Sequence, residues 1–295
     1  MIVRVLGSAA GGGVPQWNCA CANCRTARAG QGPRRTQSSF AVSGNGERWW
    51  LVNVSPDVAV QIEACEALQP RDGRGTPIAG MLLTDANVDH VGGLAVLRQA
   101  GHHAFTLYSS GTVRRLVAGD RAFAAFNQSP HRWIALGAGE TVDLGERLRA
   151  TVVPVPGMTP GYAGREMLAD AVVAYEIEDG TTGARVLVAP VFCAWSQALG
   201  AAIERCGLAF ADGSFWSDDE LAGVGIAKAA RALGHLPAAG PFGSFRALRE
   251  LAPTTRIYYA HLNNTNPLLD PGSGPALEIE RAGIGVAYDG LEIDF

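Results

Sequence analysis

The chain has no long hydrophobic run. None of its apolar stretches approaches the roughly 20 residues that a membrane-spanning helix needs. The apolar start at residues 1–6 is short and lacks the basic lead of a signal peptide. We therefore expect a protein of the cytoplasm that contacts no membrane.

An excess of basic residues is also missing. Lysine and arginine number 24 against 28 acidic residues, so the formal net charge is -4, which argues against a general binder of phosphate backbones. The glycine-rich residues 7–13 lack the G-x-G-x-x-G spacing, and no Gly-Lys-Ser/Thr follows them. We expect neither nucleic acid nor a nucleotide as a partner.

Histidine is scarce where a metal hydrolase would have most of it. In the spacing H-x-H-x-D-H, directly after the apolar run 78–83, Asp85 and Asn87 occupy the first two positions, and only Asp89 and His90 keep their ligand chemistry. A two-metal hydrolase would lose most of one site, whereas a one-metal site of oxygen and imidazole ligands would survive. The plain alternative is that Asp89 only caps a helix.

Three of the six cysteines, Cys19, Cys21 and Cys24, lie within six residues. In a chain of this length without a secretion signal, such a cluster indicates metal binding before disulfides. A closed tetrahedral zinc site needs a fourth ligand, which we expect from a distant His or Asp. The scattered Cys65, Cys193 and Cys206 are expected to be small buried hydrophobes.

Strand and helix signals alternate along the chain and divide it into two α/β halves. No repeat, low-complexity tract or linker separates the halves, so we expect one domain over residues 1–295, with a cysteine-rich zinc loop at 17–25. Expected strands are 3–6, 38–43, 49–54, 78–83, 105–108, 141–144, 148–154, 171–177, 185–188, 208–210 and 256–260. Expected helices begin at 55 or 56 and cover 93–99, 113–126, 196–205, 226–233 and 243–251.

Further ligand-type residues end strands in the second half. Asp212 follows the strand 208–210, and His261 follows the strand 256–260. Residues 156–161 have the form P-G-H-T-P-G with Met158 in the histidine position. His235 lies in a Gly-His-Leu-Pro loop just before the last of these strands.

Asp89-His90, Asp212 and His261, in this order, resemble the metallo-β-lactamase superfamily. Within it, the chain is more closely similar to the PqqB family of pyrroloquinoline quinone biosynthesis. The motifs that carry this likeness are residues 6–19, 35–39, 53–57, 234–237, 261–267 and 287–290. The resemblance is weakest between 108 and 206.

The resemblance implies an αββα sandwich, a four-layer α/β fold, with zinc in the cysteine loop and a separate mononuclear iron site. The implied reaction is O₂-dependent hydroxylation of the tyrosine ring in a small Glu-Tyr-derived peptide intermediate. The residues agree, because two imidazoles, His90 and His261, with a carboxylate suit Fe(II) and O₂. Asp212 is the favoured carboxylate, and Asp89 either binds the iron or orients a ligand.

Supporting roles follow for several other side chains. Asp85 and Asn264 are expected behind the metal ligands, bracing them. His235 either binds the metal or acts as acid or base on the phenol, since its unperturbed pKa lies near neutrality. Arg35 is a candidate for binding substrate carboxylates. Three other histidines are expected on the surface or in loops: His102, His103 and His131.

Two other functions stay open. One is hydrolysis of a phosphodiester or ester by one or two zinc ions, and the other is a carrier that holds the quinone or its precursor without turnover. The substrate class and the metal would separate these functions. Self-association into a homo-oligomer is also left open by the sequence.

Overall fold

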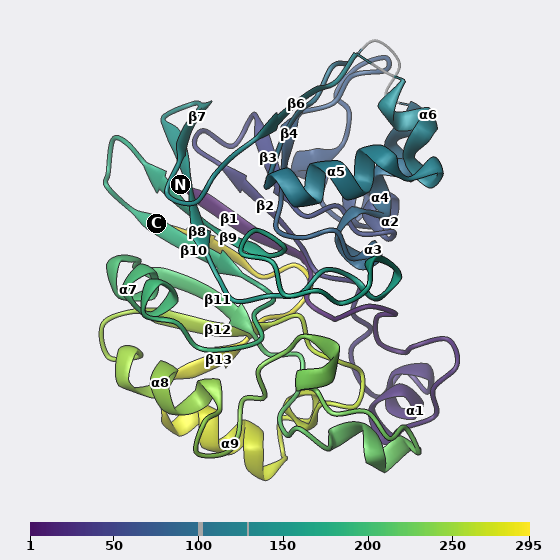
Figure 1. Ribbon diagram of the computed structural model, residues 1–295, viewed down its shortest axis with the longest axis vertical. Coiled ribbons are helices and arrows are strands. Elements are labelled where there is room, and N and C mark those ends of the chain that lie inside the picture. Colours follow the sequence, from purple (N-terminus) through teal and green to yellow (C-terminus); the bar gives the residue numbers. More distant parts are fainter. Residues whose placement is uncertain (100–102, 129) are drawn as a thin grey trace.

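The computed structural model describes residues 1–99, 103–128 and 130–295. Two seven-stranded mixed sheets lie face to face (Figure 1). The first sheet has the order β14 (Glu292–Asp294), β1 (Ile2–Gly7), β2 (Ser39–Ser43), β3 (Trp49–Val52), β4 (Ile78–Leu83), β5 (Thr106–Ser109) and β6 (Arg132–Ala135). The second has the order β13 (Ile284–Val286), β12 (Arg256–Ala260), β11 (Leu208–Asp212), β10 (Arg185–Ala189), β9 (Val173–Asp179), β8 (Leu148–Pro154) and β7 (Thr141–Gly145).

Helices cover the outer face of each sheet, so the predicted αββα arrangement is confirmed (Figure 1). The first half contributes α2 (Val58–Glu63), α3 (Val88–Val91), α4 (Gly93–Val96), α5 (Gly111–Gly119) and α6 (Ala124–Asn127). The second contributes α7 (Gln197–Arg205), α8 (Ser244–Leu251) and α9 (Gly274–Arg281). In the cysteine loop, α1 (Ala22–Arg28) begins after Cys21 and contains Cys24. None of the described helices is long and apolar enough to cross a membrane.

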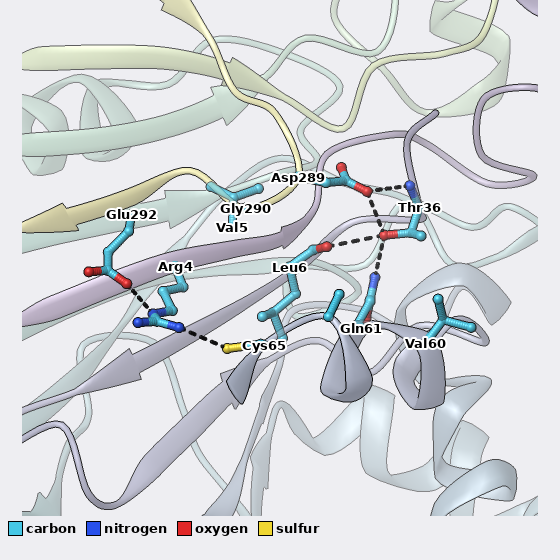
Figure 2. Close-up of a pocket in the computed structure, with 11 residues that line it drawn as sticks. Arg4, Val5, Leu6, Thr36, Val60, Gln61, Cys65, Asp289, Gly290 and Glu292 are labelled. Carbon is cyan, nitrogen blue, oxygen red and sulfur yellow. Dashed lines mark hydrogen bonds and ion pairs between the residues drawn. The ribbon is translucent and has the colours of Figure 1, made fainter. Parts of the chain in front are cut away.

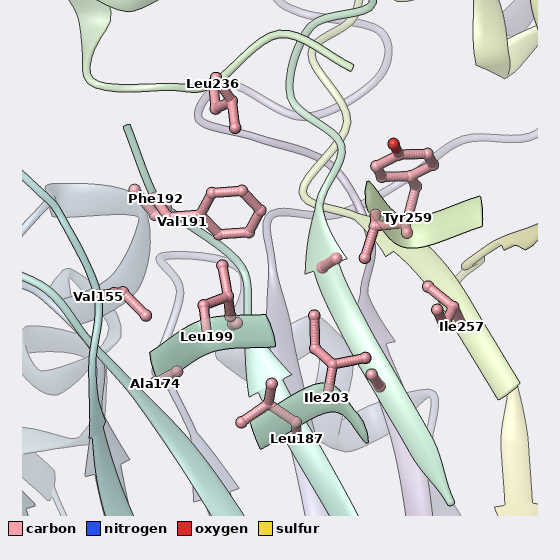
Figure 3. Packing of buried hydrophobic residues seen from close by; sticks show 14 of the residues in the cluster. Val155, Ala174, Leu187, Val191, Phe192, Leu199, Ile203, Leu236, Ile257 and Tyr259 are labelled. Carbon is pink, nitrogen blue, oxygen red and sulfur yellow. The ribbon is translucent and has the colours of Figure 1, made fainter. Parts of the chain in front are cut away.

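Apolar layers between the sheets and under the helices hold the fold together. The layer between the sheets joins β2 to β11, where the rings of Phe40 and Phe210 lie 5.0 Å apart. The layer under α7 and α8 packs Leu199 and Ile203 against the second sheet (Figure 3). Burying each such side chain contributes roughly 1.5–3 kcal/mol, so the sheets form a rigid platform for the loops at their ends.

Parallel pairing decides where those loops meet. β3, β4, β5 and β6 run parallel in the first sheet, and β10, β11, β12 and β13 run parallel in the second. The carboxyl ends of parallel neighbours share one sheet edge, which is where α/β folds place their ligands. Residues that follow β4, β11 and β12 therefore gather in one place.

Two helix predictions were wrong in extent. Residues 226–230 are not helical, and only a 3₁₀ turn forms at Arg231–Leu233, because Asp218 accepts backbone hydrogen bonds from Ala230 and Arg231. These tertiary bonds override the helix propensity of an alanine-rich stretch. The helix expected over 113–126 breaks after α5, where Asp120 caps a separate turn.

Candidate metal centre

Five predicted ligand residues converge at the carboxyl ends of the strands. They form two groups of three whose ligand atoms lie within 4.8 Å of one another, and both groups include His261. The first group is Asp89, His90 and His261, and the second is Asp212, His235 and His261. Asp89 and His90 lie in α3 just after β4, Asp212 is the last residue of β11, and His261 directly follows β12.

In the first group, His90 presents its Nε2 atom to the centre. Its Nδ1 lies 2.6 Å from Asp85 Oδ2, and the ring is fully buried. Nδ1–H therefore donates to the carboxylate, which leaves the lone pair of a neutral ring on Nε2. That nitrogen is buried without a hydrogen-bond partner. Asp89 Oδ2 lies 3.8 Å from it, so the pair fits a metal ion between them.

His261 is held in the matching orientation. Its Nδ1 lies 2.7 Å from Ser214 Oγ, and its Nε2 lies 3.1 Å from Asp89 Oδ2. Its φ of 58° is in the left-handed region that a non-glycine residue rarely adopts. Such strain is kept only where the surroundings enforce it, as at functional sites.

The Asp212 carboxylate forms more hydrogen bonds within the protein than Asp89 does. Its Oδ1 accepts from the Ser214 amide at 2.9 Å and hydroxyl at 2.6 Å, and its Oδ2 from the Phe192 amide at 3.1 Å. His235 Nδ1 lies 2.9 Å from the same Oδ2. Four donors already surround this carboxylate, so the geometry favours Asp89 over Asp212 as the carboxylate of a single-metal site.

At His90 and Asp89, charges within the centre oppose the effect of burial on the pKa. Burial lowers the pKa of His90, but Asp85 and Asp89 raise it to about 9. Burial raises the pKa of Asp89, but His90 and His261 lower it below its usual range. Burial and the charge on His90 lower the pKa of His261. A metal bound here must displace the His90 proton, so its affinity falls with acidity.

The cysteine loop forms a third group. The sulfurs of Cys19, Cys21 and Cys24 lie within 4.8 Å of one another. No carboxylate or imidazole of the described residues joins them, so the distant His or Asp that we expected as fourth ligand is absent from this group. Asn264, predicted to brace the metal ligands, lies instead beside these sulfurs.

A cavity of about 730 Å³ opens beside the cysteine loop, where Cys19, Cys21 and Asn264 line it. It reaches the centre at Gly11, where an added Cβ would lie 3.4 Å from Asp89, and at Phe215, whose ring lies 5.7 Å from that of His235. Arg25 and Lys228 bring positive charge to its wall. The cavity thus lies next to the centre, and two cations stand in its wall.

Arg35 is not among the residues that line this cavity. It donates to Ser8 Oγ at 3.0 Å and to the Ala287 carbonyl. Nearby, the Asp289 carboxylate accepts hydrogen bonds from the hydroxyl groups of Ser8 and Thr36. Asp289 and Thr36 line a separate cavity of about 270 Å³ (Figure 2). The geometry speaks against a substrate-binding role for Arg35, because its guanidinium braces the chain.

Sequence reasoning missed Ser214 and Thr84. Ser214 contacts three members of the second group, and its place two residues after Asp212 at a strand end was the available signal. Thr84 donates to Asp85 Oδ2 at 2.8 Å. Asn87, in a missing-histidine position, also donates to Asp85. Asn87 therefore helps to hold the Asp85 carboxylate that accepts the hydrogen bond from His90.

The remaining histidines lie away from the centre. His131 stacks between Phe105 and Phe126, and His103 bonds the Arg74 carbonyl at 2.7 Å. His102, predicted in a loop or on the surface, lies outside the described residues.

Comparisons with known proteins show the family of this chain. A family model described as "Beta-lactamase superfamily domain" matches residues 48–262. Proteins named "Coenzyme PQQ synthesis protein B" from Ruegeria pomeroyi and Pseudomonas paraeruginosa are 37% and 39% identical. Each alignment covers 99% of this chain and 99% of the relative.

Solved structures give the same result. A crystal structure of Zn²⁺-bound PqqB from Methylobacterium extorquens has a TM-score of 0.93 and 38% identity over 100% of both chains. A diphosphatase of the PhnP family has a TM-score of 0.72 over 100% of this chain and 96% of its own, but at 19% identity it shows the fold alone. This chain belongs to the coenzyme PQQ synthesis protein B family of the β-lactamase superfamily.

Proposed function

We propose that this protein acts in pyrroloquinoline quinone biosynthesis as an iron-dependent, O₂-using hydroxylase. Its substrate is the tyrosine ring of a small Glu-Tyr-derived peptide intermediate. Full-length similarity to the coenzyme PQQ synthesis proteins supports the pathway. The donor set at the centre supports the reaction class.

The observation that carries the proposal is the pair of imidazoles around Asp89. His90 Nε2 is buried without a partner, and His261 Nε2 lies 3.1 Å from the same carboxylate. Two histidines and one carboxylate with open positions are the ligand set of non-haem iron oxygenases. Bound there, Fe(II) would supply positions for O₂ and substrate.

A neighbouring side chain, His235, is placed to transfer a proton. Burial opposes a charge on His235, but the Asp212 carboxylate raises its pKa. The Asp212 carboxylate holds the proton on Nδ1, so His235 is suited to act as the acid or base toward a phenol oxygen. Asp85 and Ser214 keep the other two imidazoles turned toward the centre.

The cavity fits a substrate with several carboxylates. Arg25 and Lys228 line it, as do polar residues such as Asn263 and Thr265. Cations suit the acid groups of a peptide or amino-acid derivative. We propose Arg25, which lines this cavity where Arg35 does not, for the part that the sequence suggested for Arg35.

The test is reconstitution of the full chain with Fe(II) without air, followed by metal analysis and O₂ uptake with a tyrosine-containing substrate. We expect one iron per chain, O₂ consumption and a hydroxylated ring. His261→Ala and Asp89→Ala should remove the iron and keep zinc in the cysteine loop. Iron and ring hydroxylation retained in both variants would refute the assignment.

Hydrolysis is the second candidate, because Asp212, His235 and His261 form a second group of possible metal ligands next to Asp89 and His90. A dinuclear site would activate water for hydrolysis. Two tightly held zinc ions, with cleavage of a phosphodiester or ester and no O₂ uptake, would favour this function.

A further inference from the structure

Three sulfur-bearing side chains gather beside the candidate metal centre, apart from the cysteine loop. They are Met158 and Met167, in the segment between β8 and β9, and Cys193, in the loop after β10. Cys193 Sγ lies 3.9 Å from Met167 Sδ. We call these three residues the sulfur cluster. None of them belongs to the ligand groups of the centre or of the cysteine loop.

Backbone pairing holds Met158 next to the other two. Met158 and Met167 face each other in an antiparallel bridge, in which the side chains of opposed residues lie on one face with Cβ atoms ~4.5–5.5 Å apart. The Cys193 amide donates to the Pro156 carbonyl at 2.9 Å, so the loop after β10 is fixed to the same segment. Because methionine has three flexible torsions, all three sulfurs can meet around one ion.

The spacing of the sulfurs fits a metal ion bound between them. Bonds of ~2.3 Å from one ion to three sulfurs in a plane place neighbouring sulfurs ~4 Å apart. The observed distance of 3.9 Å between Cys193 Sγ and Met167 Sδ agrees with that value. Thiolate and thioether sulfurs are soft ligands that select Cu(I), whereas zinc sites use thiolate, imidazole and carboxylate. The donor set therefore favours monovalent copper.

The sulfur cluster is open to solvent. Met167 is 57% exposed, and Met158 and Cys193 are partly exposed. Methionine and free cysteine that only fill a core are buried, as Met81 and Cys206 are in this chain. A dissolved ion can therefore reach these sulfurs.

Charges near Cys193 suit a monovalent cation. Burial and the Asp212 carboxylate raise the pKa of the thiol, against the effect of Arg231. The ion must therefore displace the thiol proton, which passes to solvent. The Cys193 thiolate and Cu(I) together carry no net charge, so the site needs no further counter-ion.

We propose that Met158, Met167 and Cys193 form a binding site for Cu(I), with one thiolate and two thioethers as ligands. Copper stays monovalent on binding, so no electron is transferred. Met158 occupies the histidine position of the P-G-H-T-P-G pattern. A position that supplies an imidazole in that pattern thus supplies a soft ligand here. The assignment does not rest on the proposed function.

The test titrates the full chain, prepared with zinc, with Cu(I) in the absence of air against the chromophoric chelator bicinchoninate. A zinc indicator records zinc release at the same time, which separates copper at the sulfur cluster from copper that displaces zinc. The variants are Cys193→Ala, Met167→Leu and Met158→Leu. Cys206→Ala and Met81→Leu are matched controls, because they replace the same residue types in the core. Circular dichroism checks that each variant is folded.

We expect wild type to bind one Cu(I) per chain that releases no zinc. Cys193→Ala should lose this copper, and Met167→Leu and Met158→Leu should each bind it at least about tenfold more weakly. Both controls should behave like wild type. Copper binding only with zinc release would overturn the site. Wild-type affinity in either methionine variant would overturn the three-sulfur assignment.

Two further measurements locate the ion. Bound Cu(I) should block alkylation of Cys193 by iodoacetamide, as followed by peptide mass spectrometry, because the thiolate is the nucleophile. Unchanged alkylation would contradict the proposal. His261→Ala should bind this Cu(I) like wild type, so a failure of the proposed iron centre would leave the result intact. Copper lost in His261→Ala would place the ion at the imidazoles of the centre and overturn the assignment.

Discussion

At the scale of single residues, hydrogen bonds behind each imidazole decide which nitrogen faces the centre. The Asp85 carboxylate accepts a hydrogen bond from Nδ1–H of His90, and Ser214 contacts Nδ1 of His261. Partners of this kind fix the tautomer and ring orientation of metal-binding histidines. The orientation of both ligands thus depends on residues that would not touch the metal.

Asp85→Asn tests this dependence. The amide keeps the shape but loses the charge that holds the His90 proton, so we expect the centre to bind Fe(II) or Zn²⁺ roughly 10–100-fold more weakly. Metal titration against a competing chelator measures the change. Glu63→Gln, which removes an exposed carboxylate, is the control. Equal affinity in wild type and Asp85→Asn would show that Asp85 does not orient the ligand.

Glu220 supplies a pH-dependent prediction. Burial raises its pKa to about 7 despite hydrogen bonds from Thr265 and the Trp216 amide. The folded state therefore holds a proton that the unfolded state releases near pH 4.5. Stability should fall as pH rises from about 4.5 through 7, because unfolding releases that proton in this range.

Glu220→Gln should accordingly be more stable than wild type at pH 8.5, by at most ~3 kcal/mol, and equal to it near pH 4. Gln can accept from the Trp216 amide and donate to Thr265. Denaturant unfolding across this pH range measures the difference, with exposed Glu47→Gln as control. A difference that is the same at every pH would contradict the titration of Glu220.

At the scale of elements, β11 and β12 set the distance between Asp212 and His261. These strands are parallel neighbours, and the Gly213 amide donates to the Ala260 carbonyl at 2.8 Å just beyond β11. A Cβ at Gly213 would lie 2.7 Å from Tyr259 Cβ. Only glycine permits this close approach.

Gly213→Ala should push the two strand ends apart. We expect a loss of roughly 1–3 kcal/mol in the free energy of unfolding and weaker metal binding at the centre. Gly119→Ala, where an added Cβ meets nothing within 4 Å, should show neither loss. Denaturant unfolding and metal titration of both variants measure these losses. Wild-type stability and metal affinity in Gly213→Ala would refute the prediction.

At the scale of the whole molecule, the two ends of the chain pair with each other at one edge of the first sheet. β1 pairs with β14, and the Met1 amine donates to the Phe295 carbonyl at 2.7 Å. Asp289 accepts from the amide and hydroxyl groups of Ser8 and Thr36. Distant segments therefore support the loop that leads from β1 to the cysteines.

Asp289→Ala should leave those donors without partners and destabilise the fold by roughly 1–3 kcal/mol. Denaturant unfolding measures the loss. Asp294→Ala is the control, because that side chain is 77% exposed. Equal stability of the two variants would contradict the bracing role of Asp289.

Much of this architecture could be predicted from local patterns. Apolar runs and turn residues indicated most central strands, including β4, β8 and β11. The short edge strands β6, β13 and β14 and the helices α1 and α9 were missed. An edge strand of three or four residues carries little periodicity, and its pairing depends on the sheet beside it.

The sequence by itself determined the strand-end positions of Asp89, His90, Asp212 and His261, and the cysteine cluster, because their spacing is local. Only the tertiary structure decided that His261 is shared by two groups, that Asn264 lies against the cysteine sulfurs, and that Arg35 braces the chain. Those contacts join segments up to about 250 residues apart, as between Arg35 and Ala287. Their formation depends on sheet packing, which no local pattern encodes.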